Sequence, residues 1–184
     1  MKATGIVRRI DELGRVVIPK EIRRTLRIRE GDPLEIFTDR EGGIILKKYS
    51  PVGELMELAR EFANSIYKTS GYTSIVCDKD MILAAAGRAK KEYIENPISA
   101  GLESVIENRR LVLLRASEGH SMIAIKNGED LSNIETEVIA PIISEGQAIG
   151  AVLMVSKKEE KSIDETEAKL AEAAAHVLGA QMEQ

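Results

Sequence analysis

The first 50 residues carry more apolar strand positions than a fold of that length can bury by itself. Four short segments rich in β-branched and aliphatic residues predict strands, at residues 4–10, 15–18, 34–38 and 44–48. Between the two pairs, Pro19 suits the first turn of a helix, and a short helix is expected from Lys20 to Arg27. The sequence therefore predicts a ββαββ module.

A module of this size buries too small a share of its apolar surface to be comfortably stable alone. The chain has one cysteine, Cys77, so an internal disulfide cannot compensate. One short helix cannot cover the apolar strand positions, which are Ile6, Val7, Val16, Val17, Ile18, Ile36, Phe37, Ile44, Ile45 and Leu46. We therefore expect the strands of two chains to pack together in an intertwined homodimer.

Ser50-Pro51 marks a domain boundary, because serine is favoured at a helix N-cap and proline in the first helical turn. We expect a first domain at residues 1–50, a junction at 51–55 and a second domain at 56–184. A helix should run from the boundary to Gly71, and Ser162 to Glu165 fits the capping box of a final helix. The intervening pattern predicts a helix at residues 98–108 and strands at 72–77, 81–85, 111–114, 122–126, 138–143 and 149–156. The fold class is therefore α+β.

The two parts of the chain carry opposite net charge. Residues 1–50 hold 12 Lys and Arg against 8 Asp and Glu, a net +4, whereas residues 51–184 hold 14 against 22, a net −8. A basic head on an acidic body is typical of proteins that bind a polyanion such as nucleic acid. Charge by itself is equally compatible with a solvated surface.

The segment from Lys2 to Leu26, KATGIVRRIDELGRVVIPKEIRRTL, together with IILKKY at residues 44–49, resembles the DNA-binding domain of the AbrB family of transition-state regulators. The resemblance implies a small swapped-hairpin β-barrel made by two chains, which agrees with the dimer expected from size. It implies that the DNA-contacting residues are Arg8, Arg15, Arg23 and Arg24, and Arg9 and Lys2 are additional candidate cations.

Arginine suits this task because its planar guanidinium forms paired hydrogen bonds to phosphate or guanine and keeps its charge. Four arginines per chain give eight per dimer, and neutralising about eight phosphates predicts a log–log salt slope of roughly −7. Without a recognition helix of ordinary length, these residues are expected to read DNA shape as much as base edges. The alternative is that Arg23 and Arg24 merely pair with Glu21 or Glu30 on the surface.

The second domain is similar to GAF domains, in which an antiparallel sheet is flanked by helices and cups a ligand. The likeness rests on PIISEGQAIGAVLMVS at residues 141–156 and on the order of elements. With both domains included, the chain resembles two-domain sporulation regulators of endospore-forming bacteria, which implies a cytoplasmic activator and repressor of sporulation-phase genes. The second domain is expected to sense a small-molecule effector or to assemble two dimers into a tetramer.

Candidate oligomerisation residues follow the repeat of a helix bundle, and they are Val52, Leu55, Ala59, Phe62 and Ile66. The same stripe could instead dock on the sheet of its own domain.

Catalytic and metal chemistry have no candidate residues. Cys77 lies in an apolar strand and is expected to be a buried small side chain. His120 and His176 lack metal-ligand spacing, and Gly42-Gly43 is interpreted as a hairpin turn, not a phosphate loop. We expect no enzyme, no cofactor, no metal and no membrane segment, because the longest apolar runs fall short of a membrane span.

A DNA-binding transcription regulator is therefore the favoured function. The alternative is an antitoxin-like module that sequesters a partner protein, because swapped-hairpin folds also occur in antitoxins. In those proteins an acidic tail wraps the partner, whereas the tail here has the pattern of a folded domain.

Overall fold

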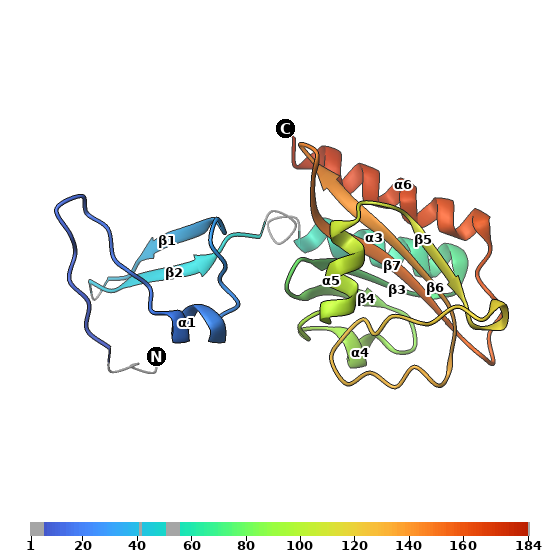
Figure 1. Ribbon diagram of the computed structural model, residues 1–184. Helices are drawn as coiled ribbons and strands as arrows, with labels where there is room; N and C mark the ends of the chain where they lie inside the picture. Colours follow the sequence, from blue (N-terminus) through green and yellow to red (C-terminus); the bar gives the residue numbers. More distant parts are fainter. Residues whose placement is uncertain (1–5, 41, 51–55, 184) are drawn as a thin grey trace. The chain divides into compact units, whose positions relative to one another are not determined.

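The computed structural model describes residues 6–40, 42–50 and 56–183 of the 184-residue chain (Figure 1). The chain divides into two compact units, of which the first ends at Tyr49 and the second begins at Ser50. Both units combine helices with antiparallel strands, so the chain is α+β as predicted. None of the described helices is long and apolar enough to cross a membrane.

The first unit is built around one hairpin and one short helix. Strand β1 (Leu34–Thr38) pairs antiparallel with β2 (Ile44–Lys48), so that Ile36 lies opposite Leu46. In the connecting loop the Asp39 carboxylate accepts a hydrogen bond of 2.7 Å from the Gly43 N–H, and Gly42 adopts a φ of +83°. The pairing of β1 with β2 confirms the predicted hairpin. A glycine at position 42 allows the positive φ that the turn needs and that other residues rarely adopt.

Helix α1 (Lys20–Thr25) begins after Pro19, as the sequence predicts, but ends two residues early. Arg27 has a φ of +53°, in the left-handed region, which stops the helix there. The Ile28 N–H then bonds back to the Arg23 carbonyl at 2.8 Å. The predicted end at Arg27 is therefore corrected to Thr25.

The two strands predicted at residues 4–10 and 15–18 do not form in the described part of that region. Residues 6–18 contain a turn, in which the Asp11 N–H bonds to the Arg15 carbonyl and Gly14 has a φ of +77°, but no strand ladder. A strand needs a neighbour that satisfies its backbone groups. Among the described residues these segments pair with no strand, although their residues favour extended structure.

The second unit is a five-stranded antiparallel sheet between two helical layers (Figure 1). The strands lie in the order β4-β3-β7-β6-β5. The central pair, β6 (Ile134–Ser144) and β7 (Gln147–Lys157), forms a long hairpin. The other strands are β3 (Thr73–Asp78), β4 (Ile82–Ala86) and β5 (Val112–Arg115).

Helices α3 (Met56–Ser70) and α6 (Glu165–Gln181) cover one face of the sheet, and α4 (Lys90–Tyr93) and α5 (Ala100–Glu107) cover the other. Each face has its own apolar core, with Met154 on the α3/α6 side and Leu153 on the α4/α5 side. Because successive side chains of β7 alternate between these cores, both faces of the strand are buried.

Two expectations for the second unit need correction, and one helix, α4, was not predicted. The capping box of α6 is formed by Asp164 and Glu167, two residues after the predicted pair. Residues 122–126 form no strand: one isolated bridge joins Ile98 to Lys126, while carboxylate side chains take up the N–H groups of Ile123 and Ile125.

Candidate nucleic-acid interface

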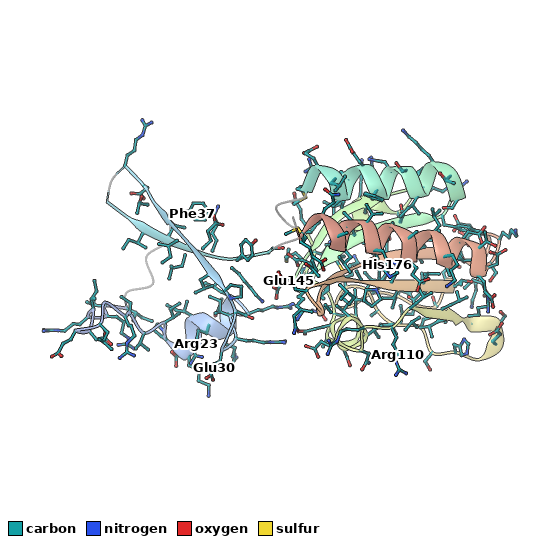
Figure 2. All side chains as sticks on the ribbon, turned by 90° about the horizontal axis from the view of Figure 1, so that it is seen from above. Arg23, Glu30, Phe37, Arg110, Glu145 and His176 are labelled. Carbon is teal, nitrogen blue, oxygen red and sulfur yellow. The ribbon has the colours of Figure 1, made fainter. Side chains whose placement is uncertain are left out.

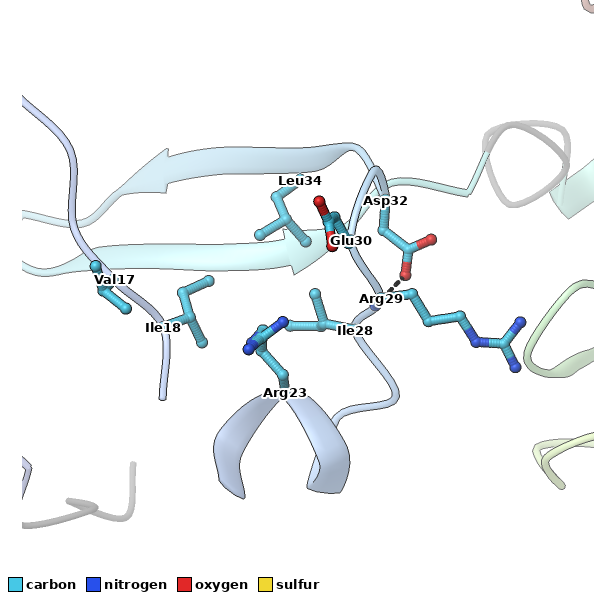
Figure 3. Close-up of a pocket in the computed structure, with 8 residues that line it drawn as sticks. All are labelled: Val17, Ile18, Arg23, Ile28, Arg29, Glu30, Asp32 and Leu34. Carbon is cyan, nitrogen blue, oxygen red and sulfur yellow. Dashed lines mark hydrogen bonds between the residues drawn. The ribbon is translucent and has the colours of Figure 1, made fainter. Parts of the chain in front are cut away.

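Arg23 and Arg24 are neighbours on α1 but lie in different surroundings. Arg24 is exposed, whereas Arg23 is half-buried. Arg23 lines a pocket of about 320 Å³ and points toward Ile18 and Ile28 (Figure 3). The other lining residues are Val17, Arg29, Glu30, Asp32 and Leu34. Neither arginine forms a described ion pair with Glu21 or Glu30, so the described contacts do not support the surface-pair alternative.

Arg15 is presented by the turn that follows Asp11. The Arg15 Nε lies 2.8 Å from Oδ2 of Asp11, and the other carboxylate oxygen accepts the N–H groups of Leu13 and Arg15. The backbone hydrogen bond from Arg15, followed by that from its side chain, lowers the pKa of Asp11. The Arg15 side chain is still 70% exposed, so its guanidinium is accessible to a phosphate.

Arg8 and Arg9 lie in residues 6–18 and are both exposed. Arg8 lines an apolar groove of about 360 Å³ together with Val16, Leu26, Ile44 and other residues. Lys2 lies outside the described residues. The first unit therefore exposes Arg8, Arg9, Arg15 and Arg24 and leaves Arg23 half-buried beside a pocket.

A large apolar surface accompanies these cations in the first unit. Val7 is 86% exposed, Leu13 74% and Val17 71%. Ile10, Val16, Leu26, Ile36 and Ile44 are also more than half exposed. Phe37 projects from the hairpin, while Arg23 and Glu30 lie at the helix and the loop after it (Figure 2). So many exposed large apolar side chains in one small unit are typical of a surface that another molecule covers.

The first unit also has an internal brace. Lys48 at the end of β2 forms an ion pair with Asp32 at 3.1 Å, and the Asp32 carboxylate accepts the Arg29 N–H at 2.7 Å. Partial burial raises the pKa of Asp32, but the hydrogen bonds from Arg29 and Lys48 outweigh it and lower the pKa overall. This brace fixes the loop between α1 and the hairpin.

The candidate oligomerisation residues lie in different places. Ala59 and Ile66 are buried in the core between α3 and the sheet, and Phe62 packs partly against that core. Val52 and Leu55 lie outside the described residues. The stripe on α3 therefore docks mainly on its own sheet, which was the alternative interpretation.

The residues considered for other chemistry lie apart from one another in the second unit. Cys77 is fully buried in β3, and burial raises the pKa of its thiol. The Nδ1 atom of His120 accepts the Arg115 N–H at 3.0 Å, and His176 lies exposed on α6 (Figure 2). No group of three or more possible metal ligands occurs among the described residues.

Sequence reasoning missed a buried polar cluster on the α4/α5 side of the second unit. Glu137 is 1% exposed, and its Oε2 accepts the Ile123 N–H at 2.7 Å. Glu129 accepts the Tyr93 hydroxyl at 2.6 Å and the Ile125 N–H at 2.5 Å. The sequence does hold a signal for this cluster: Glu137 stands at an inward position of the largely apolar strand at residues 134–144.

Comparison with known proteins identifies both parts of the chain. Residues 54–183 match the family described as stage V sporulation protein T C-terminal, transcription factor. Residues 7–54 match the family described as antidote-toxin recognition MazE, bacterial antitoxin.

Two curated proteins of Bacillus subtilis (strain 168) are similar in sequence. Stage V sporulation protein T is 50% identical over 184 residues, which cover all of both chains. Transition state regulatory protein AbrB is 71% identical over 51 residues, which cover 28% of this chain and 52% of AbrB. The expected resemblance of the head to AbrB, and of the whole chain to a sporulation regulator, is confirmed.

Solved structures show the fold of the larger part. The second GAF domain of DevS from Mycobacterium smegmatis matches with a TM-score of 0.54 at 12% identity, covering 73% of this chain and 94% of that one. A methyl-accepting chemotaxis protein fragment matches with a TM-score of 0.57 at 18% identity, covering 70% and 88%. The predicted GAF-like fold is thus confirmed.

The family match covers most of the chain, and the identity to stage V sporulation protein T is 50% over its whole length. The chain belongs to the stage V sporulation protein T family, which is a family of transcription factors and not of enzymes.

Proposed function

We propose that this chain is a cytoplasmic DNA-binding regulator that activates some sporulation-phase genes and represses others. It binds duplex DNA as a dimer through Arg8, Arg15, Arg23 and Arg24, with Arg9 and Lys2 adding positive charge. The observation that carries the proposal is that one small unit exposes Arg8, Arg15 and Arg24, and half-buries Arg23, in the same unit as many exposed apolar side chains.

The proposed occupant of the apolar groove is the first unit of a second copy. The groove is lined by Ile6, Val16, Val17 and Ile44. The first three belong to residues 6–18, a segment with a strand-forming sequence that joins no sheet in the part of the chain that the structure describes. A second copy would supply a strand partner and a cover for the groove, because its own residues 6–18 offer backbone hydrogen-bonding groups and apolar side chains. Burial of this surface favours pairing by about 25 cal/mol for each Å² of apolar area.

The positions of the arginines are compatible with a dimer whose guanidinium groups contact the phosphates of the DNA backbone. Arg15 on its turn and Arg24 on α1 are exposed, whereas Arg23 is half-buried and lines the same pocket as Ile28. A half-buried arginine side chain loses less entropy than an exposed one when its guanidinium binds a phosphate. We therefore expect Arg23 to contribute more to affinity than Arg24.

The test is fluorescence-anisotropy titration of duplex DNA at several salt concentrations with the full chain. The doubly substituted Arg23→Ala/Arg24→Ala variant should bind at least tenfold more weakly and show a salt slope reduced by about 3 to 4 from roughly −7, since two phosphate contacts per chain are lost. The matched control is Lys90→Ala/Lys91→Ala, which removes two exposed cations from α4 of the second unit.

The control variant should retain the affinity and slope of the unsubstituted chain. Equal binding by the arginine variant and the unsubstituted chain would show that α1 does not contact DNA. Equal loss in both variants would show that net charge, not the interface, governs binding.

We propose that the second unit senses a small-molecule effector or assembles two dimers into a tetramer. For assembly, the available apolar side chain on the outer surface of α6 is Val177, which is 45% exposed. Val177→Lys should convert tetramers into dimers in sedimentation velocity, whereas Ile94→Lys, at a 37% exposed position on the opposite side of the sheet, should not. If both variants sediment as the unsubstituted chain does, α6 is not the assembly surface.

Sequestration of a partner protein is the second candidate, because residues 7–54 match an antitoxin family. In this chain the region after the head is a folded five-stranded domain, not an extended tail. Specific DNA binding that persists in purified full-length protein supports the regulator, and this function remains our proposal.

A further inference from the structure

Glu137 occupies an unusual place for a carboxyl group. It lies in the middle of β6, 1% exposed, with apolar Leu114 of β5 and Val155 of β7 as its cross-strand neighbours. Its Oε2 accepts the Ile123 N–H, but its Oε1 has no hydrogen-bond partner among the described residues. A buried acceptor without a partner is costly, and an ionised one is more so.

The segment that covers Glu137 has little secondary structure of its own. Residues 119–133, which we call the strap, connect the short 3-10 turn after β5 to the start of β6. Two side-chain hydrogen bonds attach the strap to the domain: Glu137 of β6 accepts the Ile123 N–H, and Glu129 of the strap accepts the Tyr93 hydroxyl of α4. Glu129 also accepts the Ile125 N–H within the strap. Glu137 is thus a fastening between the sheet and the strap.

A second set of bonds fastens the middle of the strap to the start of α5. The Ser99 hydroxyl donates to the Ala124 carbonyl, and the Ser99 N–H donates to the Ile125 carbonyl at 2.9 Å. Ile125 is 1% exposed and belongs to the core on the α4/α5 side. Opening the strap would therefore expose both Glu137 and part of that core.

We propose that the strap is a proton-controlled cover, closed while Glu137 is protonated and released when Glu137 ionises. The closed strap removes water from Glu137 and places a second carboxyl, that of Glu129, nearby. Both effects disfavour the charged form of Glu137. An open strap would let water solvate the carboxylate, so ionisation and opening favour each other.

The groups that face Glu137 in the closed state disfavour its ionised form. Burial, followed by the field of Glu129, raises the pKa of Glu137 from 4.5 to about 7, although the Ile123 N–H lowers it in part. From α4, Tyr93 faces the cluster, and burial also raises the pKa of its hydroxyl, so it stays neutral. Helix α5 presents apolar Leu102 and Ile106 to this face of the sheet.

The pH window follows from the two pKa values of Glu137. Below about 4.5 the carboxyl is protonated whether the strap is open or closed, and above about 7 it is ionised in both states. Between these limits, opening releases a proton. The equilibrium constant for opening should therefore rise up to tenfold for each pH unit and then level off near pH 7.

The experiment is hydrogen–deuterium exchange of the full chain between pH 5 and 8, read by mass spectrometry. Exchange rates in peptides covering residues 119–133, corrected for the intrinsic pH dependence of amide exchange, should accelerate about tenfold per unit up to pH 7. Peptides from the centre of β7 should show no such acceleration. In Glu137→Gln the strap peptides should exchange with a corrected rate that is independent of pH.

The matched control is Glu135→Gln, the same change two residues away on β6, which should keep the pH dependence of the unsubstituted chain. A flat profile in the unsubstituted chain would overturn the proposal, and this outcome needs no variant to fold. The proposal also fails if Glu137→Gln retains the acceleration, because another group would then control the strap.

Discussion

The hydroxyl of Ser50 donates a hydrogen bond of 2.5 Å to Oδ2 of Asp78, 28 residues further along the chain. Asp78 ends β3 and is 7% exposed, and its other carboxylate oxygen accepts the N–H groups of Asp80 and Met81 at 2.7 Å each. One carboxylate thus fixes both the turn into β4 and the first residue of the second unit.

Removing the Ser50 hydroxyl should destabilise the second unit. Ser50→Ala leaves the Asp78 carboxylate with one fewer donor, and hydrogen bonds to charged groups contribute about 1.5 kcal/mol or more. Urea unfolding followed by circular dichroism should show this loss. Ser65→Ala, at an exposed position on α3, is the matched control and should change stability by less than about 0.5 kcal/mol.

Substitution by alanine should change the stability of the protein in opposite directions at two helical glycines. A Cβ at Gly179 of α6 would lie 2.0 Å from the Ile143 carbonyl oxygen, whereas one at Gly101 of α5 would have its nearest neighbours at 3.5 Å. Gly179→Ala should therefore cost about 3 kcal/mol by forcing α6 away from β6. Gly101→Ala should stabilise by about 0.5 to 1 kcal/mol through helix propensity, and equal effects in thermal unfolding would contradict this packing.

The stability of the second unit should fall as pH rises from about 4.5 to 7. The folded state raises the pKa of Glu137 to about 7, so it binds a proton that the unfolded state has already lost in this range. The stabilisation is complete below the ordinary pKa and is lost by pH 7, a difference of about 3 kcal/mol. Urea unfolding of Glu137→Gln at the same pH values should lack this component, and parallel curves for the two proteins would refute it.

Freeing Arg15 from Asp11 should strengthen DNA binding. Asp11→Asn keeps an oxygen for the turn's backbone N–H groups but removes the charged partner of the guanidinium. Glu12→Gln is the matched control, since it removes the same charge from the same turn. Anisotropy titration should show a few-fold gain for Asp11→Asn beyond that of Glu12→Gln. Weaker binding by Asp11→Asn would mean that the ion pair holds Arg15 in its binding position.

Local signals in the sequence predicted the elements whose hydrogen bonds close within one segment. Pro19 sets the start of α1, and Gly42 and Gly43 set the hairpin between β1 and β2. The two strands of the long β6–β7 hairpin were also predicted, at residues 138–143 and 149–156, and only a short polar segment separates them. In each case the partner of the element is next to it in the chain.

The errors occurred where the partner is distant or is a side chain. Residues 6–18 have the composition of strands but join no sheet within the described ranges, and residues 122–126 are held by carboxylates instead of by a neighbouring strand. The burial of Glu137 depends on the strap folding over β6, which no local periodicity encodes. The arginines of the candidate site could be named from the sequence, but the half-burial of Arg23 against Ile28 depends on tertiary packing.

The uncovered apolar surface of the first unit, on which Val7 and Val17 lie, has a consequence for regulation by protein amount. The second unit buries two cores within one chain, so a folded second unit does not require a second copy. If a second copy supplies the cover for the first unit, folding of that unit is coupled to association and follows mass action. Dilution would then unfold the first unit while the second unit stays folded. The number of molecules in the cell would therefore decide whether a DNA-binding surface exists.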